Sequence, residues 1–208
     1  MLGATFLALA LATVAGFGLI HYGGQGIIYL GVASLLGALL YTGGPFPLAY
    51  HGLGEVCALV FFGFVAVLGT YYVQAGWPAP APVWLAAATC GLLAANILLI
   101  NNIRDIATDT RAGKRTLAVR FGRPFAQRLY FFNLSFAFVT PIVFFAIHFG
   151  GLALIALVEA PLGLLLMRVL VKTPDNDGPR FNRLLADSVQ FLILWTALLS
   201  VGIVLSPA

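Results

Sequence analysis

Two aspartates four residues apart, Asp105 and Asp109, are the side chains of this sequence best suited to chemistry. Asn101 lies four residues before Asp105, so on a helix all three side chains point the same way. Two carboxylates on adjacent turns repel each other, and a divalent cation would reverse that cost. Mg²⁺ typically takes one or two carboxylates, keeps several waters and completes its shell with the phosphate oxygens of a substrate. The spacing therefore favours a magnesium site that faces a phosphorylated ligand.

Cations flank this pair. Arg104 precedes Asp105, and Lys114 and Arg115 follow Gly113, a residue type that commonly ends a helix. Arginine and lysine bind the free oxygens of a diphosphate, so the stretch is typical of a metal–diphosphate site. The spacing is equally compatible with a solvated loop whose basic residues serve membrane orientation.

The composition decides the class of fold. The chain has 208 residues, of which 61% are hydrophobic and 9% charged. Soluble domains carry about 25% charged residues, so we expect the bilayer to be the main solvent. The apolar runs are too long for the strands of a membrane barrel, and the basic residues cluster beside these runs, which gives no indication of nucleic-acid binding. The sequence predicts an all-α, polytopic transmembrane bundle in a single membrane-embedded domain over residues 1–208.

Seven membrane spans are predicted, at roughly 2–20, 26–42, 54–74, 82–101, 127–147, 150–171 and 188–206. Two loops carry most of the Lys and Arg residues, one between the fourth and fifth spans and one before the last span. With alternating spans both loops fall on the same side, and the excess of positive charge predicts that this side is cytoplasmic. We expect the C-terminus to lie outside, in the plasma membrane of a prokaryote.

The run NNIRDIATDTRAGKRTLAVRFG, which starts at Asn101, resembles the second aspartate motif of the UbiA superfamily of intramembrane prenyltransferases. Within that superfamily it is most similar to the 1,4-dihydroxy-2-naphthoate polyprenyltransferase branch of menaquinone biosynthesis. The stretches YTGGPFPLAYHGLGEVCALVFFGFVAVLGTYYVQ and FNRLLADSVQFLILWTALLSVGIVL carry further resemblance. The similarity extends over nearly the whole chain.

This resemblance implies a Mg²⁺-dependent transfer of a polyprenyl group from an allylic diphosphate to an aromatic acceptor. For the naphthoate branch the acceptor is 1,4-dihydroxy-2-naphthoate, and demethylmenaquinone forms. By motif match Asp105 and Asp109 bind Mg²⁺, with Asn101 or Asn102 as an oxygen ligand or in support of one. The residues expected to contact the diphosphate are Lys114, Arg115, Arg104 and Asn102.

The resemblance also implies nine transmembrane helices and a first aspartate motif, of the form N-D-x-x-D-x-x-x-D. Counted from the C-terminus, the seven predicted spans correspond to the third to ninth helices, so we expect the first two helices and that motif to be absent from this chain. A Y-x-x-x-K motif found in many superfamily members lacks its lysine here, because Pro45 stands four residues after Tyr41. Tyr41, Tyr50 and Glu55 are expected to border the substrate cavity.

Two alternatives to an active transferase stay open from the sequence. One is a non-catalytic or partner-dependent membrane protein that retains half a site. The other is a transporter. A transporter is expected to carry charged residues near the middle of the membrane, whereas those of this chain lie almost entirely in loops.

Overall fold

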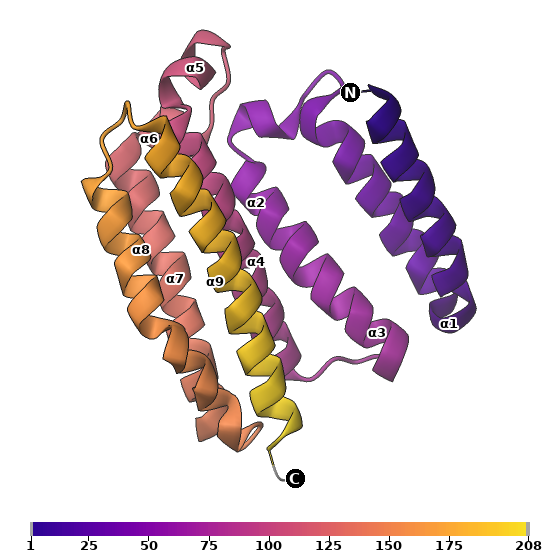
Figure 1. Cartoon of the computed structure of the whole chain (residues 1–208). Helices are drawn as coiled ribbons and strands as arrows, with labels where there is room; N and C mark the ends of the chain where they lie inside the picture. Colours follow the sequence, from indigo (N-terminus) through magenta and orange to yellow (C-terminus); the bar gives the residue numbers. More distant parts are fainter. Residues whose placement is uncertain (1, 207–208) are drawn as a thin grey trace.

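The computed structural model describes residues 2–206, and these form helices joined by short loops, without any strand. Six helical segments in this range are long and apolar enough to cross a membrane. They are Gly3–Thr42, Gly54–Ala75, Ala81–Arg104, Arg123–Ala146, Gly151–Lys172 and Gly178–Val204. The predicted class, a polytopic helical bundle, is confirmed (Figure 1).

The number of segments differs from the prediction at the N-terminal end. The predicted spans 2–20 and 26–42 lie within one element, α1 (Leu2–Thr42), which has a non-helical break at Gly24 (φ 57°, ψ −145°). This backbone conformation is open to glycine and costly for other residues. The two arms fold back on each other (Figure 1), so the chain crosses the bundle twice within this element.

The next segment begins after a short 3₁₀ turn, η1 (Leu48–His51), and joins three helical elements end to end. These are α2 (Gly54–Ala58), the π-helical η2 (Leu59–Leu68) and α3 (Gly69–Ala75). The segment packs against α4 (Ala81–Arg104), and Gly63 of η2 and Gly91 of α4 let the two backbones approach closely. Small residues permit such close helix contacts in membranes.

Helix α4 occupies the centre of the bundle, in contact with η2, α7 (Arg123–Ala146) and α9 (Gly178–Val204). Between α7 and α9 the chain passes through η3 (Gly151–Glu159) and α8 (Ala160–Lys172). Buried aromatic residues fill the space between these helices, among them Trp195, Tyr130, Phe144, Phe181 and Phe191. Many large apolar residues remain exposed on the outer faces, as expected where lipid replaces water.

Hydrogen bonds between side chains and backbone link these central helices. Asn133 donates to the Asn96 amide oxygen (2.9 Å), and Asn96 donates to the backbone carbonyl of Tyr130 (3.1 Å). The indole of Trp195 donates to the carbonyl of Ala137 at 2.7 Å. Such bonds fix the relative positions of membrane helices, which pack without a hydrophobic driving force between them.

Both predicted basic loops lie at the same end of the bundle (Figure 1). One contains the short helices α5 (Ile106–Arg111) and α6 (Leu117–Phe121), and the other joins α8 to α9. The last described residues of the chain lie at the opposite end (Figure 1). The structure thus groups the charged loops as the alternation of spans predicted.

The last helix starts ten residues earlier than the predicted span at 188–206. Helix α9 begins at Gly178, where the side chain of the N-cap residue Asp177 accepts a hydrogen bond from the backbone N–H of Arg180. The charged residues of its first turns continue the same helix beyond the apolar region. The predicted span thus covers the apolar part of a helix that extends further toward its N-terminus.

Candidate active site

The aspartate stretch continues α4 almost without a break. Helix α4 ends at Arg104, Asp105 is its C-cap (φ −98°, ψ 10°), and α5 starts at the next residue. The backbone N–H of Asp105 donates to the carbonyl of Asn101 (3.0 Å), and that of Asp109 donates to the carbonyl of Asp105 (2.8 Å). The predicted i, i+4, i+8 relation among these residues is therefore kept in the backbone.

The chain reverses direction after α5. Helix α5 ends at Arg111, and Gly113 adopts a positive φ of 71° two residues later, as predicted for a glycine that ends a helix. The N–H of Lys114 then donates to the carbonyl of Asp109 at 2.9 Å. This turn brings the Lys114 side chain back over Asp109.

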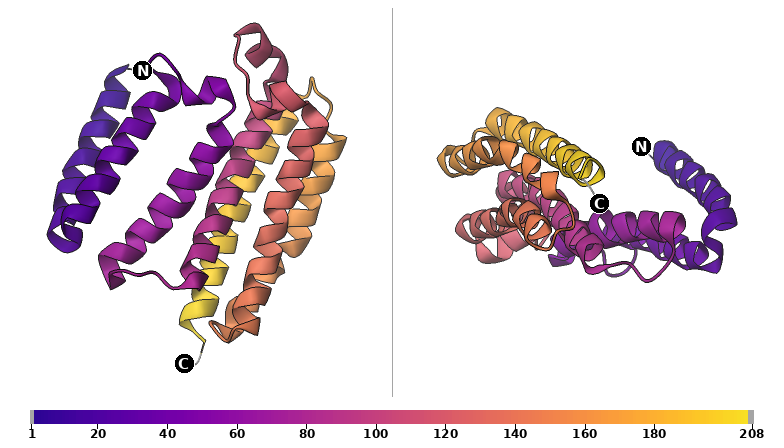
Figure 2. Two further views of the ribbon diagram at one scale, coloured as in Figure 1. Left: turned by 180° about the vertical axis from the view of Figure 1, so that it is seen from behind. Right: turned by 90° about the horizontal axis from the view of Figure 1, so that it is seen from below.

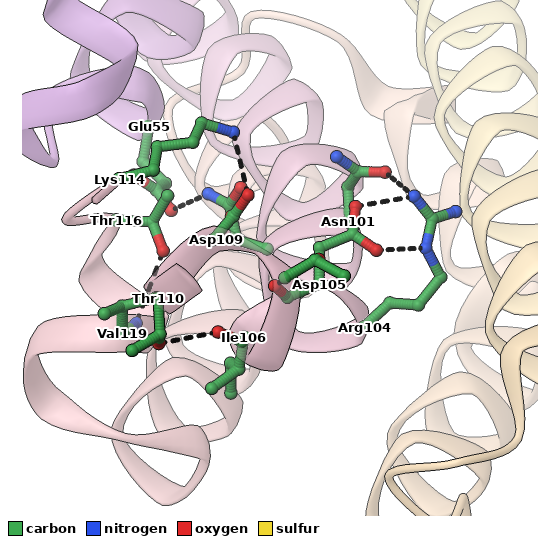
Figure 3. A network of polar contacts seen from close by, with 12 residues as sticks. Glu55, Asn101, Arg104, Asp105, Ile106, Asp109, Thr110, Lys114, Thr116 and Val119 are labelled. Carbon is green, nitrogen blue, oxygen red and sulfur yellow. Dashed lines mark hydrogen bonds and ion pairs between the residues drawn. The ribbon is translucent and has the colours of Figure 1, made fainter. Parts of the chain in front are cut away.

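Asp105 is held by the arginine that precedes it. Arg104 donates to both carboxylate oxygens, from Nε at 2.8 Å and from Nη2 at 2.7 Å. The same Nη2 donates to Oδ1 of Asn101 (2.6 Å), and Nη1 donates to Oδ1 of Asn182 on α9 (2.7 Å). A fork of this kind fixes the orientation of a carboxylate. Figure 3 shows Asn101, Arg104 and Asp105 as one cluster.

Asp109 belongs to a second cluster. Its Oδ1 accepts from Nζ of Lys114 at 3.4 Å, a long ion pair, while its Oδ2 is buried and has no hydrogen-bond partner among the described residues. Only 9% of the residue is exposed. A buried carboxylate oxygen without a partner is costly, so it indicates a ligand, an ion or a water that would bind there.

Glu55 reaches the same region from the first turn of α2. Its Oε1 accepts from Nδ2 of Asn102 on α4 at 2.8 Å, and both residues are buried. Its Oε2 also lacks a partner within the described part of the chain. Figure 3 places Glu55 next to Lys114 and Asp109.

A backbone contact ties the aspartate stretch to the loop before α2. The N–H of Arg115 donates to the carbonyl of Tyr50 at 2.9 Å. Gly52, with φ 75°, passes so close that an added Cβ would lie 2.9 Å from the carbonyl oxygen of Arg115. The side chains of Tyr50 and Arg115 are both exposed at this edge.

A cavity of about 920 Å³ opens between α1, α2, η2, α4 and α9. Its wall is almost wholly apolar, with Phe61, Phe62 and Leu98 among the larger side chains. Figure 2, in the view from below, shows how α1 and α9 are arranged around α2, η2 and α4. Tyr41 and Asn101 line this cavity, whereas Glu55 and Tyr50 are not among its lining residues.

The sequence of this chain matches the UbiA prenyltransferase family over residues 2–188. The chain belongs to the UbiA prenyltransferase family. Its relatives include proteins named 1,4-dihydroxy-2-naphthoate octaprenyltransferase from Mycobacterium leprae, 37% identical over 94% of this chain, and from Escherichia coli, 38% identical over 98%. A third, from Mycobacterium tuberculosis, is 42% identical over 79% of this chain.

The chain spans only part of the length of these UbiA relatives. The matched regions cover 65%, 63% and 55% of the three proteins, in the order given above.

A divalent cation, which the UbiA family implies, fits the residues present. The described residues hold no group of three or more His, Cys, Asp and Glu side chains that could bind a metal. Magnesium needs only one or two carboxylates when phosphate oxygens and water complete its shell. The buried Oδ2 of Asp109, which has no partner among the described residues, would supply one such ligand.

Sequence reasoning missed Asn182 as a member of the site. It lies 78 residues after Arg104 and is brought to it by the packing of α9 beside α4. Nothing local distinguishes an exposed asparagine in the first turns of a helix from any other surface residue. The contact between Glu55 and Asn102, 47 residues apart, was likewise not predicted, although both residues had been singled out.

Proposed function

We propose that this chain carries out the polyprenyl transfer characteristic of its family, from an allylic diphosphate to an aromatic acceptor. One observation carries the proposal: Asn101 both lines the apolar cavity and bonds to the Arg104 that holds Asp105. A charged site at the mouth of an apolar cavity matches a donor with a charged head and a hydrocarbon tail. The names of the relatives favour 1,4-dihydroxy-2-naphthoate as the acceptor.

The proposed reaction breaks the allylic carbon–oxygen bond, and the diphosphate leaves with the electron pair. A ring carbon of the acceptor forms the new carbon–carbon bond, and with dihydroxynaphthoate the carboxyl group at that carbon leaves as carbon dioxide. A cavity that excludes water protects the allylic cation from capture. The apolar side chains around Phe61 and Leu98 supply that exclusion.

The charged residues of this chain act on the leaving group. Lys114 and Arg115 would bind diphosphate oxygens, and Arg104 orients Asp105. Magnesium bound at Asp105 and Asp109, with Asn101 or Asn102 in support, would neutralise the charge that develops on the diphosphate. Arg104 leaves lone pairs free on Asp105, since each carboxylate oxygen can accept more than one bond.

The location in the cell follows from charge. The loops that contain the aspartates and the basic residues lie at one end of the bundle, and cytoplasmic loops carry the excess of Lys and Arg. We therefore assign the aspartate end to the cytoplasm of a prokaryotic cell, the C-terminus to the outside, and the bundle to the plasma membrane.

The test is a transfer assay with the protein in lipid nanodiscs. A radiolabelled polyprenyl diphosphate is supplied with Mg²⁺ and dihydroxynaphthoate, and the lipid-soluble product is separated and identified by mass. Product that requires the donor, the acceptor and the metal supports the proposal. Absence of both product and diphosphate binding contradicts it, and a transporter would instead move a solute without forming a new bond.

A further inference from the structure

Glu55 is a buried acid that the aspartate motif does not include. Only 5% of its surface is exposed, and Asn102 donates to just one of its two carboxylate oxygens. The other, Oε2, is buried and has no partner among the described residues. Buried polar atoms in folded proteins are nearly always paired, so an exception of this kind needs an explanation such as an ion or water.

Asp109 shows the same feature on the neighbouring element. Its Oδ2 is buried and unpartnered within the described residues, while Oδ1 contacts Lys114. Lys114 forms its ion pair with Asp109, and its positive charge also favours the ionised form of the nearby Glu55 carboxylate. Figure 3 shows Lys114 extending over Asp109 on the side where Glu55 lies.

Asp105 differs from these two acids. Arg104 donates to both of its oxygens, so neither oxygen is without a partner. Among the described residues, the buried carboxylate oxygens without a partner at this end of the bundle therefore come from α2 and α5, not from the two aspartates of one motif. Two oxygens from separate helices can approach a cation from different directions, as magnesium's octahedral shell requires.

We propose that Glu55 is a ligand of the site's divalent cation, shared with Asp109, and that Lys114 takes the cation's place when none is bound. On cation binding Lys114 leaves the two carboxylates and is free to bind the diphosphate. This inference rests on the proposed function for the identity of the site, and it adds a carboxylate from α2 that the aspartate motif does not contain.

The turn that carries Lys114 has room for this movement. The Lys114 side chain is 25% exposed, so it already borders solvent. The preceding Gly113 has nothing within 4 Å of the position that a Cβ would occupy.

A third carboxylate provides a matched control. Glu159, at the junction of η3 and α8, also has a buried Oε2 without a partner within residues 2–206. It belongs to the part of the chain between α7 and α9 and takes no part in the Glu55, Asp109 and Lys114 cluster. Both Glu159→Gln and Glu55→Gln change a buried acid that has an unpartnered oxygen. If such a change weakened metal binding only by altering the stability of the fold, the two variants would lose metal affinity equally.

The experiment measures binding of Mn²⁺ alone, as a paramagnetic substitute for Mg²⁺, to the whole chain in nanodiscs by electron paramagnetic resonance. We expect Glu55→Gln and Asp109→Asn each to weaken Mn²⁺ binding by on the order of 10-fold or more, and Glu159→Gln to leave it unchanged. Lys114→Gln is expected to tighten binding of Mn²⁺ alone, because it removes the competing cation. Glu55→Asp keeps the charge and should recover part of the affinity.

Two results would overturn the inference by itself: wild-type affinity in Glu55→Gln, or equal losses in Glu55→Gln and Glu159→Gln. Thermal unfolding of each variant without metal separates a lost ligand from a lost fold. If Glu55→Gln unfolds, a folded Glu55→Asp with weakened Mn²⁺ binding supports the inference, and one with wild-type affinity overturns it. A wild-type chain that binds no Mn²⁺ contradicts this inference together with the metal dependence of the proposed function.

Discussion

Arg104 donates two hydrogen bonds, of 2.8 and 2.7 Å, to the carboxylate of Asp105, its neighbour in the chain. The two residues sit where α4 passes into α5, and the side chain of Asn101 accepts a bond from the same guanidinium. Asp109, one turn later, has only a long contact to Lys114. The two aspartates of the motif are therefore held in different ways, one fixed and the other open to a ligand.

Replacing either aspartate should abolish transfer without preventing membrane insertion. Asp105→Asn and Asp109→Asn each remove a negative charge that would hold the cation on the leaving diphosphate. Loss of a preorganised electrostatic contact of this kind costs about 100-fold or more in kcat. The measurement is the transfer assay, with the amount of folded protein in the membrane determined alongside. Near-normal turnover in both variants would remove these residues from the site.

Asn182 is expected to act as a positioning residue through Arg104. Asn182→Ala removes the acceptor for Nη1 of Arg104 but leaves the fork to Asp105 in place. Transfer should fall by less than in Asp105→Asn, and Asn182→Asp should restore it, since its carboxylate accepts the same bond. The exposed neighbour Arg183 supplies the control, as Arg183→Gln should have no comparable effect. Equal rates in Asn182→Ala and the wild type would show that the bond to α9 has no role.

The membrane-spanning elements were largely predictable from the sequence, because an apolar run long enough to cross a bilayer is itself the structural signal. The ends of those elements were not. Helix α9 begins well before its apolar part, since a helix can leave the membrane and continue with charged residues such as Arg180 and Arg183. The spans predicted at 2–20 and 26–42 correspond to the two arms of α1, which the non-helical break at Gly24 separates.

The aspartate stretch was predictable because its spacing is local. Backbone bonds link Asn101 to Asp105 and Asp105 to Asp109 at the predicted spacing, and Gly113 marks the turn that returns Lys114 to Asp109. The contacts that cross between helices could not be derived from spacing. The hydrogen bond between Glu55 and Asn102 depends on how α2 packs against α4. Residues far apart in the chain determine that packing.

The close approach of η2 and α4 is expected to depend on glycine. A Cβ at Gly63 would lie 2.5 Å from the carbonyl oxygen of Ala87 and 2.9 Å from Cα of Gly91, both backbone atoms that cannot turn aside. Gly63→Ala should therefore destabilise the fold, by about 1–3 kcal/mol if it behaves as an overpacked core site. Thermal unfolding in a single detergent measures the effect.

The control for Gly63→Ala is Gly31→Ala, in the second arm of α1, where nothing lies within 4 Å of the Cβ position. Alanine is the better helix former, so this variant should be neutral or slightly stabilising. If both variants unfold at the wild-type temperature, the packing of η2 on α4 tolerates a methyl group and the contact is looser than the distances indicate.

If the prenyl tail occupies the cavity, the effect of a bulky side chain in its wall on transfer should depend on the length of the donor's tail. Ala94 lines it from α4, and Ala94→Trp would place a large side chain in the space proposed for the prenyl tail. Transfer from a long polyprenyl diphosphate should then fall more than transfer from a short one such as geranyl diphosphate, because only the long tail needs the full volume. Ile193→Trp, at an exposed position of α9 outside the lining, is the matched control and should affect neither donor. An equal loss for long and short donors in Ala94→Trp would place the tail elsewhere.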